Sequence, residues 1–172
     1  MTTPITIGIS ACLFGQNTRY DGGHRHEPVL MKALGHVTLI PLCPEAECGL
    51  GIPREPMRLE GDPGNPRLMT ITSHCDLSER MRIWIDQRLD TLTGEAVGGL
   101  ILKARSPSCG KQVAVHGEGE PAFSPGLFAR ACRQRFPGLP IADEEELRDP
   151  AQLTDFLKRA ADHARNTQED QR

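Results

Sequence analysis

Three cysteines of this chain stand directly after short apolar runs, where side chains at the end of a buried strand can meet a ligand. They are Cys12, Cys43 and Cys109, and Glu45 comes two residues after Cys43. Thiolates bind soft metal ions and iron–sulfur clusters, and a carboxylate beside such a centre can accept a proton. Structural zinc sites usually gather their cysteines into closely spaced pairs. The wide spacing of these three therefore favours an iron–sulfur cluster held by separate loops, with a zinc ion on the same thiols as an alternative.

The other three cysteines carry less of this chemistry. Cys132 falls inside an amphipathic helical pattern, so we expect a buried core thiol. Cys75 precedes a helix but has no obvious base or partner beside it in the sequence. Cys48 forms a C-x4-C pair with Cys43, a spacing that permits chelation, yet a loop that passes a metal site can also carry a cysteine with no role in it. The start of the chain lacks a signal peptide, which indicates a reducing compartment and disfavours a disulfide framework.

A parallel sheet is the arrangement that would bring the three strand-ending cysteines together. Strands and helices alternate along the sequence, which indicates an α/β fold, a Rossmann-like three-layer sandwich with a mainly parallel sheet. Ligands in such sheets bind outside the carboxyl ends of the strands, which is where these cysteines are expected. Apolar runs predict strands near residues 5–9, 37–42, 67–72, 98–102 and 139–142. Helical spacing and capping residues predict helices over 28–34, 78–93, 127–135, 143–147 and 151–164.

The chain is long enough for one domain, which we expect over residues 1–165, followed by a polar tail at 166–172. Residues 43–65 are rich in Gly and Pro and are predicted to form a long, ordered loop, and residues 117–120 a flexible segment. Neither the dinucleotide fingerprint G-x-G-x-x-G nor the phosphate loop G-x-x-x-x-G-K-[ST] is present, so nothing supports binding of a dinucleotide or ATP.

Composition excludes several classes of partner. The net charge is -3, the positive residues are scattered, and the aromatic residues are one Trp, one Tyr and five Phe, which disfavours binding of a nucleic acid polymer. No apolar run reaches the ~18 residues that span a bilayer. We therefore expect a soluble, cytoplasmic protein that acts on a small molecule, and a monomer in preference to a dimer.

Three motifs in the same order resemble those of the thiouracil desulfidase family (TudS-like proteins). They are S-A-C-L-x-G with R-Y-D-G-G-H, then P-x-C-P-E with G-L-x-x-P-R-x-P, then L-K-x-x-S-P-S-C-G, and they extend over about residues 5–116. The resemblance implies a 4Fe-4S cluster bound by Cys12, Cys43 and Cys109, whose fourth iron takes the sulfur of a thiolated uracil. The implied reaction is not a redox reaction: the thiocarbonyl becomes a carbonyl and sulfide leaves. The chain departs from common members at Cys48.

Within that reaction, polar residues of the motifs acquire expected roles. Glu45 is placed to act as general base, or else to pair with Arg54. The resemblance favours Ser106 as a catalytic hydroxyl, with Ser108 as a hydrogen-bonding group for the substrate, although either can instead be a turn hydroxyl. The remaining predicted substrate-binding residues are Tyr20, Gly22, Gly23, His24, Arg54 and Lys103; of these, Arg54 and Lys103 suit an anionic group such as a nucleotide phosphate, or are surface charges.

The substrate expected from this resemblance is a thiolated pyrimidine as free base, nucleoside or nucleoside monophosphate. A sensing or binding module, in which the cluster responds to oxygen or iron without turnover, is a second interpretation. The zinc hydrolase that uses Cys12, Cys43 and Cys109 is a third. Analysis of the bound metal separates the zinc interpretation from the other two.

Overall fold

The computed structural model describes residues 4–170 and contains, within them, two sheets where the sequence predicts one. The larger body is built on a parallel sheet with the strand order β2-β1-β5-β8. The expected α/β fold with a mainly parallel sheet is confirmed. The strands of this sheet are β1 (Thr6–Ser10), β2 (Thr38–Leu42), β5 (Gly99–Leu102) and β8 (Ile141–Asp143).

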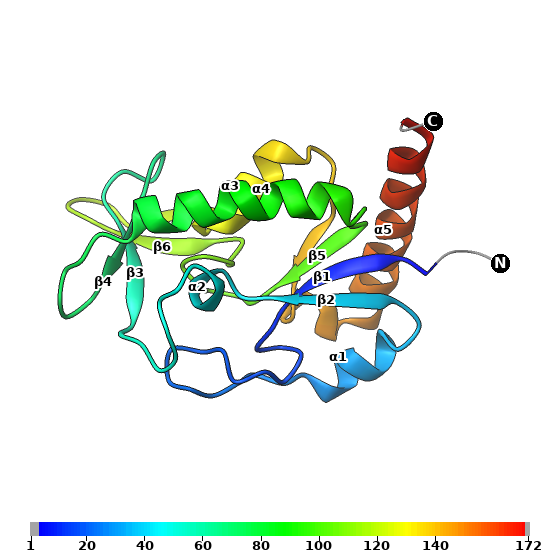
Figure 1. Cartoon of the computed structure of the whole chain (residues 1–172), viewed down its shortest axis with the longest axis horizontal. Coiled ribbons are helices and arrows are strands. Elements are labelled where there is room, and N and C mark those ends of the chain that lie inside the picture. Colours follow the sequence, from blue (N-terminus) through cyan, green and yellow to red (C-terminus); the bar gives the residue numbers. More distant parts are fainter. Residues whose placement is uncertain (1–3, 171–172) are drawn as a thin grey trace.

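Helices cover both faces of the parallel sheet and give the three predicted layers (Figure 1). Because side chains alternate along a strand, Leu100 and Leu102 pack on one face of β5 while Ile101 packs on the other. The first face is covered by α3 and α4, and the second by α1 and α5. These helices are α1 (Pro28–Ala33), α3 (Ser78–Gly94), α4 (Leu127–Arg135) and α5 (Pro150–Asp170).

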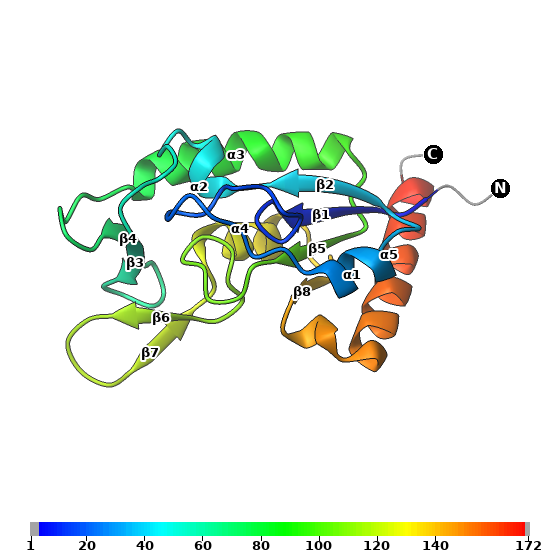
Figure 2. The same cartoon turned by 90° about the horizontal axis from the view of Figure 1, so that it is seen from below.

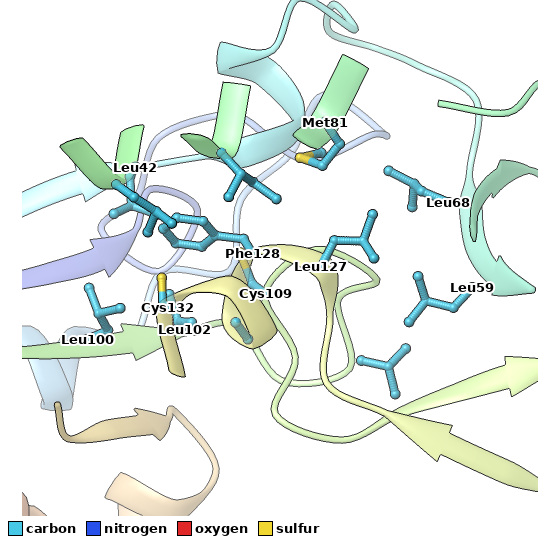
Figure 3. Packing of buried hydrophobic residues seen from close by; sticks show 14 of the residues in the cluster. Leu42, Leu59, Leu68, Met81, Leu100, Leu102, Cys109, Leu127, Phe128 and Cys132 are labelled. Atoms are coloured by element: carbon cyan, nitrogen blue, oxygen red, sulfur yellow. The ribbon is translucent and has the colours of Figure 1, made fainter. Parts of the chain in front are cut away.

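The core beneath α3 and α4 is organised around Phe128, which is fully buried and whose ring centroid lies 5.5 Å from that of Trp84. Figure 3 shows Leu102 and Cys132 in this core beside the ring. Cys132 is fully buried, which confirms the predicted core thiol, and burial raises its pKa to about 12. Burying a phenylalanine side chain contributes about 1.5–3 kcal/mol, so this ring is a main tie between α4 and the sheet.

A second, mixed sheet with the order β4-β3-β6-β7 lies at the opposite end of the molecule from α5 (Figures 1 and 2). The sequence predicts only one of its strands, β4, and misses the other three, of which β3 and β6 pair with each other across a long separation in the sequence. The predicted loop over 43–65 therefore contains a strand, and the predicted flexible segment 117–120 is the turn of a hairpin. The strands are β3 (Met57–Glu60), β4 (Arg67–Thr70), β6 (Val113–His116) and β7 (Ala122–Ser124).

Smaller differences from the prediction concern the ends of elements. A one-turn helix, α2 (Pro44–Glu47), follows β2 directly. The helix predicted over 143–147 is instead the end of β8 and a 3-10 turn (Glu146–Arg148), because Asp143 Oδ1 accepts the backbone N–H groups of Glu145 and Glu146. Helix α5 continues through residue 170, so 166–170 are helical, while residues 1–3 and 171–172 lie outside the described part. Among the described helices, none is long and apolar enough to span a membrane.

Candidate active site

The carboxyl ends of β1 and β2 point toward the second sheet (Figure 2), and the loops that follow β1, β2 and β5 enclose a pocket of about 500 Å³. In the sheet, β2 lies on one side of β1 and β5 on the other, so the loops after β1 and β5 diverge and leave a crevice between them. The three predicted ligands, Cys12, Cys43 and Cys109, all line this pocket. Six further predicted site residues share its wall: Tyr20, Glu45, Arg54, Lys103, Ser106 and Ser108.

Burial affects all three thiols, since Cys12 and Cys109 are buried and Cys43 is partly buried. Burial raises the pKa of Cys12 to about 11, and it also raises the pKa values of Cys43 and Cys109. For Cys12 and Cys109 the next largest cause is the charge of the Cys43 thiolate, which places the sulfur of Cys43 near both others. Thiols with raised pKa values are protonated at neutral pH, so a metal centre held here must displace their protons.

Backbone hydrogen bonds fix the loop that follows each strand. Cys43 precedes α2, and its N–H donates to Glu47 Oε2 at 2.6 Å, while Pro44 supplies the first helical residue. The carbonyl oxygen of Cys12 accepts the N–H of Arg25 at 2.9 Å. The N–H of Cys109 donates to Ser106 Oγ at 3.2 Å.

Close packing around the loop that carries Cys109 requires glycine at two positions, Gly110 in the loop and Gly126 at the start of α4. A Cβ atom on Gly110 would lie 2.5 Å from Val113 Cγ2 and 2.8 Å from the carbonyl oxygen of Ser106. One on Gly126 would lie 2.5 Å from the carbonyl carbon of Ser108. These close approaches let the start of α4 press against the Ser106–Cys109 turn and hold the thiol at the pocket.

Glu45 lies at the centre of a buried polar network. Its Oε2 accepts from Arg54 Nε at 3.0 Å and from Arg54 Nη2 at 2.8 Å, and its Oε1 accepts from Ser108 Oγ at 3.1 Å. Arg54 also donates to the carbonyl oxygens of Thr18 and Gly51. Glu45 is therefore paired with Arg54, as one of the two alternatives predicts, and it also lines the pocket; its role as general base stays a prediction. Ser106 Oγ lies 3.1 Å from Ser108 Oγ and extends the network.

Lys103 is paired with Glu144, a residue that the sequence does not indicate as part of the site. Its Nζ forms an ion pair with Glu144 Oε1 and donates to the carbonyl oxygen of Ala104 at 3.2 Å. Glu144 is 3% exposed, and its Oε2 accepts the N–H of Ala104 at 2.8 Å. A buried carboxylate without a partner is strongly unfavourable, so Glu144 and Lys103 hold each other in place.

Three predicted substrate-binding residues lie away from the pocket wall. Gly22 and Gly23 form a turn that closes on itself, since the N–H of Gly23 donates to Asp21 Oδ1 at 2.9 Å and Gly22 has a φ of +77°. The ring of His24 accepts the N–H of His26 through Nδ1 at 3.1 Å. The structure brings none of the three to the pocket, whereas Tyr20, from the same loop, does line it.

Other residues of the wall were not predicted as site residues, notably Thr18, Arg19 and Arg25. Arg25 reaches the pocket because its backbone is hydrogen-bonded to Cys12, a contact that no local sequence signal reveals. Cys48 is half-buried, and its thiol lies 3.4 Å from the carbonyl oxygen of Glu45, but it is not part of the wall. Cys75 is exposed and also lies outside the pocket.

A sequence model of the 2-thiouracil desulfurase family matches residues 7–144, which include the three strand ends and the pocket. The chain belongs to this family. The match extends beyond the three motifs and takes in Glu144, at the end of the fourth parallel strand.

Two further proteins resemble this family member over most of their length. The uncharacterized protein YbbK of Bacillus subtilis (strain 168) is 29% identical over 150 residues, which cover 83% of this chain and 98% of YbbK. Among solved structures, the 4Fe-4S-dependent thiouracil desulfidase TudS superposes with a TM-score of 0.68 at 27% identity, covering 88% of this chain and 98% of TudS.

Proposed function

We propose that this chain is a desulfidase that converts a thiolated uracil into the corresponding uracil and sulfide at a 4Fe-4S cluster bound by Cys12, Cys43 and Cys109. The observation that carries the proposal is the meeting of three thiols, from three separate strand ends, with a buried carboxylate in one pocket. Membership of the 2-thiouracil desulfurase family supports the reaction, and the similarity to TudS supports the cofactor.

The donor set fits such a cluster. Cysteine thiolates are the usual ligands of 4Fe-4S clusters, and three thiols line this pocket. Across residues 4–170, no three His, Cys, Asp or Glu side chains are grouped so as to hold a single metal ion. The similarity to the 4Fe-4S-dependent TudS favours the cluster over the zinc alternative. When bound, the cluster supplies an iron that binds the thiocarbonyl sulfur and polarises the C=S bond.

We assign the proton transfer to Glu45. A carboxylate offers about four lone-pair sites, two on each oxygen. Both sites on Oε2 are taken by Arg54, and Ser108 takes one on Oε1, which leaves a position on Oε1 for the attacking water. Water then provides the oxygen of the new C=O bond, the C=S bond breaks, and the sulfur leaves as sulfide with no net change of oxidation state.

Ser106 and Ser108 provide a route for the proton that the water gives up. The hydroxyls lie 3.1 Å apart, and Ser108 lies 3.1 Å from Glu45 Oε1, so a proton can pass along the chain of oxygens. We retain Ser106 as the catalytic hydroxyl at the far end of this chain and Ser108 as its link to Glu45.

The charges of the wall favour an anionic form of the substrate, such as a nucleoside monophosphate. Arg54 and Lys103 are already paired with Glu45 and Glu144, and Arg19 lies 3.5 Å from Asp21. Arg25 lines the pocket and forms no ion pair with any other residue of the described range 4–170. We therefore place the phosphate at Arg25 rather than at Arg54 or Lys103, with Tyr20 beside the base.

The test begins with anaerobic purification and measurement of iron and sulfide per chain. We expect about four of each, since a 4Fe-4S cluster contains four iron and four sulfide ions. The Cys12→Ser, Cys43→Ser and Cys109→Ser variants should each lose the cluster, while the matched Cys48→Ser and Cys75→Ser controls should keep it. Zinc without sulfide would contradict the proposal.

Turnover is then followed by the loss of the thiocarbonyl absorbance of 4-thiouracil and of 4-thiouridine monophosphate, together with sulfide release. The monophosphate should give the higher kcat/KM, and Arg25→Gln should reduce this preference about tenfold or more, because a charge-assisted hydrogen bond is worth about 1.5–3 kcal/mol. A loaded cluster without turnover of any thiolated pyrimidine would favour the sensing module instead.

A further inference from the structure

We propose that Glu144 is a positioning residue that holds Lys103 so that one N–H of its ammonium group points into the active-site pocket. This inference rests on the proposed desulfidase function and adds to it a residue from the fourth strand end. Glu144 does not line the pocket, and it acts through Lys103.

The hydrogen bonds of Lys103 carry the inference. An ammonium group has three donors. One is directed to Glu144 Oε1 and a second to the carbonyl oxygen of Ala104, and Lys103 lines the pocket, so the third donor is left for a group inside it. The backbone N–H of Lys103 is also fixed, donating to Ser10 Oγ at 2.9 Å, so the stem of the side chain starts from a rigid strand end.

Glu144 is the residue that makes this arrangement rigid. Its side chain is 2% exposed, compared with 40% for Glu145 and 42% for Glu146, the two glutamates that follow it. Both of its oxygens are used on consecutive residues of the pocket loop, Oε1 on Lys103 and Oε2 on the N–H of Ala104. Because the pair is neutral overall, Lys103 adds a directed donor to the pocket and little net charge.

The position of Lys103 identifies what its third donor can reach. The backbone N–H of Lys103 is bonded to Ser10 Oγ, two residues before Cys12, and both Lys103 and Cys12 line the pocket. The third N–H of Lys103 is therefore placed on the Cys12 side of the pocket, where a hydrogen bond can reach a sulfur atom or a polar atom of the substrate base. A donor in this place stabilises negative charge that develops on sulfur as the C=S bond breaks.

Kinetics of the purified holoenzyme test the inference. Glu144→Gln keeps an oxygen for the N–H of Ala104 but removes the charge that anchors Lys103, and we expect kcat to fall about tenfold with a smaller change in KM. The kcat of the Lys103→Met variant should fall by at least the same factor. The Lys103→Met/Glu144→Gln double variant should be no slower than Lys103→Met alone, because Glu144 acts through Lys103. Losses that multiply in the double variant would overturn the inference.

A second measurement does not depend on turnover. Lysine methylation followed by mass spectrometry should show Lys103 protected in the wild-type protein and several-fold more reactive in Glu144→Gln. The matched control, Glu146→Gln, should leave Lys103 protected and expose Lys111, its own partner. Equal reactivity of Lys103 in wild type and Glu144→Gln would refute the positioning role. If the wild type lacks turnover while Lys103 responds as expected, the proposed function fails and the positioning role stands.

The cluster potential gives a third, sign-specific result on loaded protein. Removing the negative charge in Glu144→Gln should raise the midpoint potential, removing the positive charge in Lys103→Met should lower it, and the double variant should return toward wild type. A loss of structure would not produce shifts of opposite sign. Shifts of the same sign in both single variants would contradict the arrangement.

Discussion

Replacing Arg54 with Gln should destabilise the protein more than the loss of an exposed ion pair does. The Arg54 and Glu45 side chains are only 6% and 11% exposed, and two of the arginine nitrogens donate to Glu45 Oε2. The same guanidinium also donates to the carbonyl oxygens of Thr18 and Gly51, so it ties together three segments of the chain at the pocket. Its loss leaves a buried carboxylate without a counter-charge.

Breaking a buried, hydrogen-bonded ion pair by removing one partner typically costs 3–5 kcal/mol. With an m-value of about 2 kcal/mol/M, the urea midpoint of Arg54→Gln should fall by roughly 1.5–2.5 M. Arg54→Lys keeps the charge but cannot reproduce the two-pronged contact, so its midpoint should lie between wild type and Arg54→Gln. The matched control is Arg159→Gln, which breaks an exposed pair with Asp155 and should cost about 0.5 kcal/mol or less.

The assay is urea unfolding followed by far-UV circular dichroism, on samples of equal iron content because a bound cofactor shifts the transition. An Arg54→Gln midpoint within error of the Arg159→Gln midpoint would refute the reasoning, since it would mean that Glu45 is adequately solvated without Arg54. Activity should be lost in Arg54→Gln even below the transition, because Glu45 loses the partner that fixes its orientation.

Two further predictions concern the loop of Cys109 and the second sheet. Gly126→Ala should displace the backbone at Ser108 and lower both cluster content and activity, whereas Gly94→Ala, with open space around its Cβ position, should leave both unchanged. The hydroxyl and N–H of Ser73 lower the pKa of Glu55 below its ordinary value of 4.5. The charged form therefore stabilises the fold above that value, and this stability is lost as the pH falls through the lowered pKa. Glu55→Gln should accordingly unfold at a lower temperature than wild type at pH 7, with a smaller difference near pH 3.5 in a thermal melt.

The parallel sheet could be predicted because its strands leave an unambiguous pattern. Residues 5–9 are mostly β-branched and residues 98–102 end in Leu-Ile-Leu, which is typical of strands buried on both faces. The second sheet gave no comparable signal, since β3, β6 and β7 are short, and β3 and β6 pair with each other although they lie far apart in the sequence. Helix α5 was expected to end earlier because its last turns are polar, yet polar residues continue an established helix at little cost.

The meeting of Cys12, Cys43 and Cys109 could also be anticipated, since the carboxyl ends of parallel strands share one edge of a sheet. Residues beyond that edge that pair with the pocket residues could not be anticipated from the sequence. Glu144 is one of three consecutive glutamates, and only the structure distinguishes the buried one from its exposed neighbours. Gly22 and Gly23 were expected to contact substrate because of their loop, but the turn they form with Asp21 is satisfied internally and lies away from the wall.

Two cations of the pocket wall, Arg54 and Lys103, are held in neutral pairs, and this decides how the site responds to their substitution. Arg54 is matched by Glu45 and Lys103 by Glu144, so the field at the three thiols depends on the orientation of each pair more than on net charge. Removing one member exposes the thiols to a whole unpaired charge in a poorly solvated space, whereas removing both leaves a polar but neutral wall. Paired substitutions at either site should therefore disturb cluster binding less than the single substitutions do. Such non-additivity is the behaviour expected of residues in direct contact, and it would be absent if these charges acted on the pocket independently.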